Sequence, residues 1–316
     1  MDMRALGKTG LNIAPLVFGA NVFGWTVDEK TAFSLLDALV DAGLNAIDTA
    51  DVYSAWVPGN RGGESETIIG KWLQKRPSLR DQIVLITKVG WTLGPQQQGL
   101  SERWIFEAVE GSLRRLQTDH IDLYFAHRPD PETPTEETLG AFGRLREAGK
   151  IRAIGASNFN TGQLGDALAV ASAFGLPRYD VLQPEYNLYD RAGFDGALSE
   201  LVQQEDIGVI SYYSLASGFL SGKYRSQADL GKSPRGRGIA RYLDQRGQCI
   251  LAALDTVAEG LEVQPAEVAL AWVMARAGIT APIASATSMS QLESLVRATQ
   301  LTLSTEQIAL LDRVSS

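Results

Sequence analysis

Four residues with acid–base chemistry stand at or shortly after the ends of short apolar runs in the first half of the chain: Asp48, Tyr53, Lys88 and His127. A lysine ammonium placed between a carboxylate and a phenol favours the phenolate. Lowering a tyrosine pKa from about 10 to neutrality takes roughly 4 kcal/mol of differential stabilisation. Such a tyrosine would act as a general acid near neutral pH, and a histidine within reach could hydrogen-bond a substrate oxygen. If the fold brings the four residues together, they predict proton transfer to a bound substrate.

Each of these residues also has an ordinary interpretation when it is taken alone. Asp48 could cap the segment that follows it, Tyr53 could pack in the core, and Lys88 could be a solvated strand end. His127 could be a rim histidine whose hydrogen bonds are satisfied. A glycosidase with Asp48 and Asp51 as paired carboxylates is a weaker alternative, because acids this close in the chain rarely flank a glycosidic bond. That alternative would also leave the position of Lys88 unexplained.

The segments around these residues predict an alternation of strands and helices. Runs rich in Ile, Val and Leu that are too short for helices lie at residues 16–19, 46–48, 83–87, 121–126, 151–156, 181–183, 208–212 and 279–282. Amphipathic patterns typical of helices lie between them, at residues 28–41, 101–116, 135–148, 162–174, 194–204, 249–259 and 291–299. Eight strands that alternate with helices in a chain of 316 residues favour a closed (β/α)8 TIM barrel.

We therefore expect residues 1–316 to form one barrel domain. The first residues, MRALGKTGLNIAP, predict a β-hairpin that closes the bottom of the barrel. An open, doubly wound sheet is the alternative, and it is disfavoured because no G-x-G-x-x-G follows a predicted strand. Functional residues of such a barrel gather at the C-terminal ends of its strands, which is where Asp48, Lys88 and His127 are expected.

The composition argues against several classes of partner. The formal net charge is −8, so the chain lacks the basic balance typical of nucleic-acid binding. The sequence opens without an apolar signal segment and has no run long enough to span a membrane, so we expect a cytoplasmic protein with no membrane contact. With Cys249, His120 and His127 as the soft ligands, a structural zinc site is disfavoured, whereas a carboxylate site for a hard cation stays open. The oligomeric state is not predicted.

The motifs around the four residues resemble those of the aldo-keto reductase superfamily. The resemblance begins with NAIDTADVY, GGESETIIG, LITKVG and DLYFAHRPD, and it continues through GKIRAIGASNF, LQPEYNLYDR and SYYSLASGFLSGKY. These motifs are ordered and correctly spaced, and they cover the chain from Arg4 to about Leu303. In this family an Asp, a Tyr, a Lys and a His form the catalytic tetrad, which the resemblance places at Asp48, Tyr53, Lys88 and His127.

The resemblance implies reduction of an aldehyde or ketone by hydride from a nicotinamide cofactor, without a metal. Tyr53 would give a proton to the carbonyl oxygen, and Lys88, held by Asp48, would lower the pKa of that tyrosine. His127 would orient the carbonyl group. Some relatives in this family bind the cofactor and serve chiefly as partners of membrane channels, so a regulatory subunit with little turnover is the alternative function. The intact tetrad favours an enzyme.

The resemblance also implies a set of cofactor contacts. In chain order they are Ser157, Asn158, Gln183, Tyr212, Leu215, Gly218, Lys223, Ser285, Thr287 and Gln291. The first four would hold the nicotinamide end, the next three the diphosphate, and the last three the adenosine. The family commonly has Tyr-Ser-Pro-Leu where this chain has Tyr212-Tyr213-Ser214-Leu215, which predicts a slightly different path for the diphosphate loop.

The adenosine end departs most from the family pattern. Ser294 and Leu295 replace the acid–amide pair expected to hold the adenine, and the segment IASATSMSQLESLV has no basic residue. Positive charge for a 2′-phosphate could instead come from Arg235 or Arg237, in the irregular stretch 221–246. That stretch is either a solvated loop or a phosphate-contacting lid. We expect NADP(H) to be favoured, with NAD(H) as the alternative.

Substrate contacts are expected in loops on the catalytic rim. Three tryptophans belong to these loops: Trp25, Trp56 and Trp91. They suggest an apolar or aromatic carbonyl substrate or a stacked sugar, although one or two of them could simply plug the barrel. Arg128 could meet an anionic substrate, or it could form a salt bridge with Asp130 or Glu132.

Overall fold

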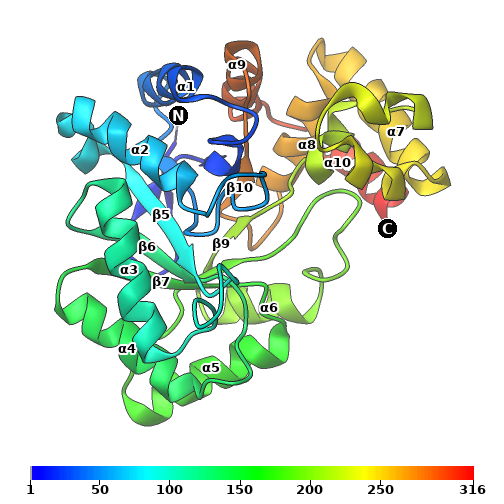
Figure 1. Cartoon of the computed structure of the whole chain (residues 1–316). Coiled ribbons are helices and arrows are strands. Elements are labelled where there is room, and N and C mark those ends of the chain that lie inside the picture. Colours follow the sequence, from blue (N-terminus) through cyan, green and yellow to red (C-terminus); the bar gives the residue numbers. More distant parts are fainter. Residues whose placement is uncertain (1) are drawn as a thin grey trace.

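Eight parallel strands close into a barrel that is surrounded by helices (Figure 1). The computed structural model describes residues 2–316, apart from the side chain of Arg237. The barrel strands are β3 (Val17–Gly19), β4 (Ala46–Asp48), β5 (Val84–Val89), β6 (Ile121–Ala126), β7 (Ile151–Ser157), β8 (Val181–Gln183), β9 (Gly208–Ser211) and β10 (Ala281–Ala284). Consecutive strands are neighbours, and β10 closes the ring between β9 and β3. Every predicted strand is present, and the largest difference is that β10 lies two residues later than predicted.

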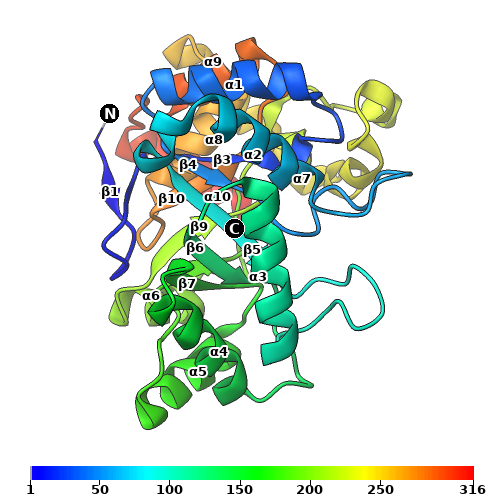
Figure 2. The ribbon, with the colours of Figure 1, turned by 60° about the vertical axis from the view of Figure 1, so that its left-hand side comes forward.

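An antiparallel hairpin of β1 (Arg4–Ala5) and β2 (Asn12–Ile13) covers the bottom of this barrel, as predicted. Its apolar side chains, including Leu6 and Ile13, pack with the residues that fill the barrel interior. Gly7, at φ +53°, lies so close to the start of β9 that a Cβ there would be 2.5 Å from the backbone nitrogen of Gly208. Figure 2 shows the hairpin on one side of the molecule and the long loops after β4 and β5 on the opposite side.

The described residues form ten α-helices around the strands (Figure 1). They are α1 (Glu29–Asp41), α2 (Glu64–Lys75), α3 (Glu102–Leu116), α4 (Thr135–Glu147), α5 (Thr161–Phe174), α6 (Ala197–Gln204), α7 (Gln245–Leu261), α8 (Pro265–Met274), α9 (Met289–Ala298) and α10 (Thr305–Ser315). The seven predicted helices are confirmed. Two of their boundaries were placed wrongly, because α6 begins three residues later than predicted and α7 begins four residues earlier. The α7 start follows from its N-cap Asp244, whose carboxylate accepts the Gly247 N–H.

Helices α2, α8 and α10 were not predicted from the sequence. Helix α2 follows Gly63, which is its N-cap at φ +85° and offers no capping side chain, so the usual start signal is absent. In α8 the residues from Glu267 to Val273 are all buried, so no polar face marks a helical period. Helix α10 does carry a signal, the capping box of Ser304 and Gln307.

The stretch 221–246 is irregular, as predicted. It contains two short 3₁₀ segments, η4 (Gln227–Lys232) and η5 (Gly236–Tyr242), and it follows η3 (Ala216–Ser221), which comes after β9. Its arginines are partly fixed by ion pairs; for example, both terminal nitrogens of Arg225 lie 2.7 Å from the carboxylate of Asp255 on α7. The stretch is therefore tied to the barrel at several points.

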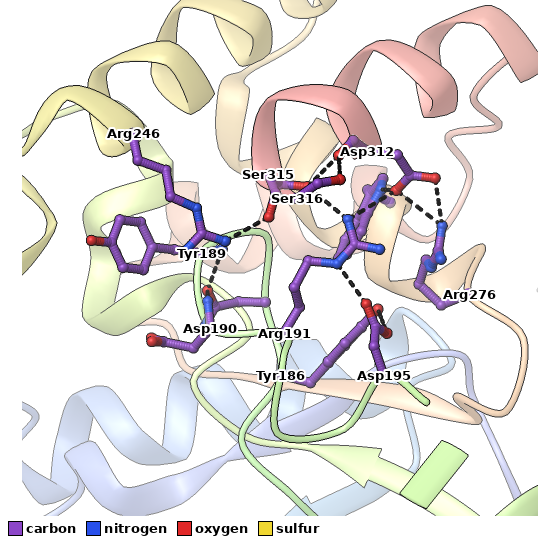
Figure 3. Close-up of polar contacts among 12 residues, drawn as sticks. Tyr186, Tyr189, Asp190, Arg191, Asp195, Arg246, Arg276, Asp312, Ser315 and Ser316 are labelled. Carbon is purple, nitrogen blue, oxygen red and sulfur yellow. Dashed lines mark hydrogen bonds and ion pairs between the residues drawn. The ribbon is translucent and has the colours of Figure 1, made fainter. Parts of the chain in front are cut away.

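A polar network fastens the C-terminal helix to the loop that follows β8 (Figure 3). Arg191 in this loop donates to Asp195 at 2.6 Å and to the Ser315 hydroxyl at 2.8 Å. Its guanidinium also lies over Trp272 of α8, at 5.1 Å from the ring centroid. The same loop pairs with the residue after β9, since Tyr212 N–H donates to the Pro184 carbonyl oxygen at 2.9 Å. The C-terminal helix thus supports the backbone that presents Tyr212.

Candidate active site

The parallel strands bring the four acid–base residues to one end of the barrel. Asp48 is the last residue of β4, Lys88 is the penultimate residue of β5, and His127 follows β6 directly. The register pairs Asp48 with Ile86 and Lys88 with Phe125, so the three positions lie on neighbouring strands at similar heights. Tyr53 reaches the same place from the loop between β4 and α2.

The ammonium of Lys88 is the centre of the cluster. It is completely buried and donates to Asp48 Oδ2 at 2.7 Å, to the Thr49 carbonyl oxygen at 2.8 Å and to Tyr53 Oη at 3.2 Å. A lysine has three N–H donors, so these contacts use all of them. Because Lys88 donates to the phenol oxygen, the hydroxyl hydrogen of Tyr53 is left for another acceptor. The cluster can therefore hold a phenol with its proton directed away from the lysine.

Gln183 is a second anchor for Asp48. Its side-chain amide, at the end of β8, donates to Asp48 Oδ1 at 3.0 Å, while Lys88 occupies Oδ2. Both carboxylate oxygens are thus fixed in the barrel interior. From the sequence, Gln183 was expected only as a cofactor contact. Its hydrogen bond to Asp48 was not predicted, because the two residues are 135 positions apart in the chain.

The expectation that Lys88 lowers the pKa of Tyr53 is wrong for this structure. Burial raises the pKa of Tyr53 well above its usual value, and the Asp48 carboxylate raises it further. The charge of Lys88 is balanced by Asp48 at 2.7 Å, so it does little to stabilise a phenolate. Burial also lowers the pKa of Lys88, an effect that Asp48 opposes. Tyr53 consequently keeps its proton across the neutral range, as a proton donor requires.

His127 is buried beside Tyr53 as a neutral imidazole. Burial, followed by the charges of Lys88 and Arg128, lowers its pKa well below the usual value. The rings of Tyr53 and His127 are 5.9 Å apart between centroids and meet edge to face. The Nδ1 atom has no hydrogen-bond partner among the described residues. The ring therefore keeps an unused hydrogen-bonding position at Nδ1.

Asp51, two residues before Tyr53, is buried without a hydrogen-bond partner for either carboxylate oxygen among the described residues. Burial is the main cause that raises its pKa well above the ordinary value, followed by the nearby carboxylate of Glu66. Glu66 itself is satisfied, since it accepts from Thr87 at 2.6 Å and from Arg115 at 2.7 Å. Burial therefore favours the protonated form of Asp51.

Asp51→Asn is expected to change how stability depends on pH. An acid with a raised pKa in the folded state holds a proton that the unfolded state releases, so its contribution to stability is present below about pH 4 and is lost as the pH rises towards the folded-state pKa. The asparagine side chain does not titrate, so the variant does not lose this stability as the pH rises. Urea unfolding between about pH 5 and pH 8 should show a stability difference, variant minus wild type, that grows with pH. A difference that stays constant over this range would contradict the assignment.

The side chains expected at the nicotinamide end lie together next to the cluster. Ser157 Oγ donates to the Gln183 carbonyl oxygen at 3.0 Å, and Asn158 Nδ2 donates to the His127 carbonyl oxygen at 2.9 Å. The Tyr212 hydroxyl donates to Asn158 Oδ1 at 2.7 Å. Amide, hydroxyl and aromatic groups therefore converge from β7, β8 and β9, which is the donor set that a carboxamide and a flat ring need.

The loop expected to hold the diphosphate has an unusual backbone. After Leu215, three consecutive residues have positive φ: Ala216 at 47°, Ser217 at 58° and Gly218 at 100°. Each left-handed residue other than glycine costs roughly 1–2 kcal/mol, and such strain is typical of ligand-binding turns. The Lys223 ammonium lies 3.6 Å from the position that a Cβ on Gly218 would occupy. Tyr213, just before this loop, also has positive φ, 53°.

The side chains expected at the adenosine end bind one another at the start of α9. Thr287 N–H and Oγ1 both donate to Gln291 Oε1, at 2.8 and 3.1 Å. Ser285, at the end of β10, donates to Asn21 Oδ1 at 2.9 Å. Arg297 on α9 is fixed by Glu267 at 2.7 Å, so it does not supply charge to the cleft.

The two residues that replace the family's adenine-binding pair are engaged in the packing of α9. Ser294 donates to Glu267 at 2.7 Å, and Leu295 is buried against the core. Arg235 approaches from the 221–246 stretch, with Nη2 at 3.4 Å from Asn21 Oδ1. Arg237, the other candidate for a phosphate contact, has its side chain outside the described part of the structure.

The three predicted tryptophans continue the rim on both sides of Tyr53. Trp56 meets the Tyr53 ring at a centroid distance of 5.7 Å, and Trp25 meets Trp56 at 5.8 Å. On the other side Trp91 lies 5.3 Å from the His127 ring. Trp56 and Trp91 are 48% and 42% exposed, so neither of these two is buried in the barrel interior.

In the part of the chain that the structure describes, no group of three or more His, Cys, Asp and Glu side chains is placed to hold a metal ion. No helix within the same residues is long and apolar enough to cross a membrane.

Comparisons with known proteins connect this site to one family. Residues 15–316 match the sequence profile of the Aldo/keto reductase family. The chain is 35% identical to the uncharacterized oxidoreductase YrpG of Bacillus subtilis, with 99% of this chain and 96% of the relative covered. It is 33% identical to a probable voltage-gated potassium channel subunit beta of Arabidopsis thaliana (94% and 91% covered) and 31% identical to protein tas of Escherichia coli (99% and 97% covered).

Proposed function

The chain belongs to the aldo/keto reductase family, and from this premise we propose that it reduces aldehydes or ketones to alcohols with hydride from NADPH, using Tyr53 as the proton donor. Family membership makes it an oxidoreductase. The proposal also covers the carbonyl substrate, the cofactor, the role of each residue and a cytoplasmic location.

One observation carries the proposal: the buried Lys88 ammonium donates to Asp48, to the Thr49 carbonyl and to the Tyr53 phenol at the same time. This arrangement fixes the phenol oxygen and leaves its hydrogen for a ligand. Burying an ion pair costs desolvation free energy that apolar residues of similar size would avoid, so a fully buried pair beside a phenol favours a role in proton transfer.

The residues around the cluster fit a nicotinamide cofactor. Ser157, Asn158 and Gln183 offer hydroxyl and amide groups of the kind that bind a carboxamide, and the strained loop with Lys223 suits a diphosphate. When bound, the cofactor supplies the hydride. The protein would orient the substrate carbonyl between His127 and Tyr53, and the Tyr53 proton would pass to the carbonyl oxygen as negative charge develops there. Lys88 would keep its hydrogen bond, which the phenol accepts at 3.2 Å, to the phenolate that this step leaves behind.

We favour NADPH because Arg235 lies near Ser285, one of the residues that we expect to contact the adenosine. Its guanidinium contacts Asn21, which also binds Ser285, and no carboxylate pairs with it among the described residues. A 2′-phosphate would supply the missing charge. NADH is the alternative cofactor.

Arg235→Ala is expected to raise the dissociation constant of NADPH about tenfold more than that of NADH, because a charge-assisted hydrogen bond contributes about 1.5–3 kcal/mol. Quenching of protein fluorescence by each cofactor measures both constants. Arg225→Ala is the matched control, since Arg225 lies in the same stretch but is paired with Asp255. Equal weakening of both cofactors by Arg235→Ala would show that this residue does not select the 2′-phosphate.

A regulatory subunit that binds cofactor with little turnover is the second candidate, because one relative is named a probable potassium channel subunit beta. Oxidation of NADPH and of NADH with a panel of aldehydes, ketones and sugars separates the two functions. We expect turnover with at least one aldehyde, together with formation of its alcohol. Tight cofactor binding without turnover of any carbonyl compound would favour the regulatory function.

A further inference from the structure

The catalytic rim carries a row of aromatic rings with an arginine at each end. From one end to the other the rings belong to Trp25, Trp56, Tyr53, His127 and Trp91, and each neighbouring pair lies within 5.9 Å between centroids. Arg235 lies over Trp25 at 5.3 Å, and Arg128 lies over Trp91 at 5.0 Å. The proposed proton donor is in the middle of the row.

Arg128 is held in place by neutral groups. Its Nη2 donates to Thr92 Oγ1 at 3.2 Å, and Thr92 in turn donates to Gln98 Oε1 at 2.8 Å. Its guanidinium carbon lies over the Trp91 ring, 5.0 Å from the ring centroid. A guanidinium has five N–H donors, so most of them are left for a ligand.

The acids near Arg128 are engaged elsewhere. Asp130 accepts from the Leu100 N–H at 2.7 Å, from the Thr133 hydroxyl at 2.7 Å and from the Glu132 N–H at 3.1 Å. Within the described residues, neither Asp130 nor Glu132 lies within 4.0 Å of the Arg128 guanidinium, so the salt bridge considered from the sequence does not form. Arg128 thus forms no ion pair within 4.0 Å among the described residues, although its charge still acts on Asp130 as the smallest influence on the pKa of that acid, after burial and three hydrogen bonds.

The two arginines face different parts of the site. Arg235 contacts Asn21, which binds Ser285 at the adenosine end, so its charge belongs with the cofactor. Arg128 follows His127 in the chain and is close enough to lower the pKa of that histidine. Arg128 therefore lies at the end of the row next to Trp91 and His127, and Arg235 lies at the opposite end, over Trp25.

We propose that Arg128 binds an anionic group of the substrate, and that the preferred substrates are aldehydes with a carboxylate at the far end of an aromatic or flat apolar body. This inference rests on the proposed function of the site. The carbonyl oxygen would lie at Tyr53 and His127, the flat body would pack on Trp91, and the carboxylate would accept paired hydrogen bonds from the guanidinium. Stacking on Trp91 pre-orients the guanidinium, which strengthens such a contact.

The test compares 4-carboxybenzaldehyde with its methyl ester, which has the same ring and aldehyde but no charge. We expect wild type to show a kcat/KM about tenfold higher for the acid, mainly through a lower KM. Arg128→Met should remove this preference, so that kcat/KM falls about tenfold more for the acid than for the ester. Arg128→Lys should keep part of the preference. Circular dichroism and the Tm establish that each variant is folded.

Arg144→Met is the matched control, because Arg144 also lies over an aromatic ring, Phe106, but is paired with Glu102 on the outer helices. It should keep the wild-type preference. Reduction of both aldehydes with equal kcat/KM by wild type, or equal losses for both with Arg128→Met, would overturn this inference and leave the proposed function intact. Failure of wild type to reduce either compound, or any other carbonyl, would overturn both.

Discussion

Tyr53→Phe is expected to lower kcat for carbonyl reduction by about 10²–10⁴-fold, the usual contribution of a positioned acid. Phenylalanine keeps the ring that contacts Trp56 at 5.7 Å and His127 at 5.9 Å, so the wall of the site stays in place. The substitution removes the hydroxyl that Lys88 fixes at 3.2 Å. No other phenol lies within hydrogen-bond distance of that ammonium in the described structure.

Steady-state kinetics with a good aldehyde substrate measure this loss, and cofactor titration shows that the site still binds NADPH. Tyr213→Phe is a suitable control, because it makes the same chemical change in an exposed tyrosine on the same rim. We expect the control to keep turnover within a few-fold. Near-native turnover by Tyr53→Phe would show that another group supplies the proton.

Asp48→Asn is expected to reduce the free energy of unfolding by about 3 kcal/mol, towards the lower end of the cost of breaking a buried ion pair. The Lys88 ammonium has no exposed surface, and Asp48 is its counterion at 2.7 Å. An amide oxygen can still accept a hydrogen bond, but it leaves the buried charge unbalanced. Turnover should fall as well, because Lys88 would then release its proton more easily and hold the phenol less firmly.

Urea unfolding of wild type and the variant measures the difference in stability. Adding Lys88→Met to Asp48→Asn removes the unbalanced charge, so the double variant should regain part of the lost stability although it stays inactive. A loss below about 1 kcal/mol, typical of exposed pairs, would contradict the account of a desolvated ion pair.

The barrel could be predicted from local sequence because each strand is a short β-rich run between turn signals. The helices were harder to predict, because α8 has no polar face and α2 begins after Gly63 without a capping side chain. The N-terminal hairpin was predictable from two extended runs around its turn, and its apolar side chains do fill the bottom of the barrel.

Some features of the candidate site could be predicted from the sequence, and others could not. Spacing and motifs brought out Asp48, Tyr53 and Lys88, and the geometry places all three in one hydrogen-bonded cluster, although their chemical roles stay a proposal. The direction of the Tyr53 pKa shift was predicted wrongly, because it depends first on burial and then on the Asp48 carboxylate, and no local sequence pattern reports how deeply the phenol is buried. The contact of Gln183 with Asp48 joins strands far apart in the chain, so it needed the closed barrel to be seen.

A single-turnover experiment tests the central claim most directly. Wild-type protein in excess over NADPH is mixed with an aldehyde that the panel identifies as a substrate, and both the loss of NADPH absorbance and the alcohol formed are measured. The account predicts one alcohol for each NADPH consumed, with a rate that falls by about 10²–10⁴-fold in Tyr53→Phe at unchanged NADPH occupancy. Bound NADPH that stays reduced in the presence of every aldehyde tested, or an equal rate in the variant, would contradict it.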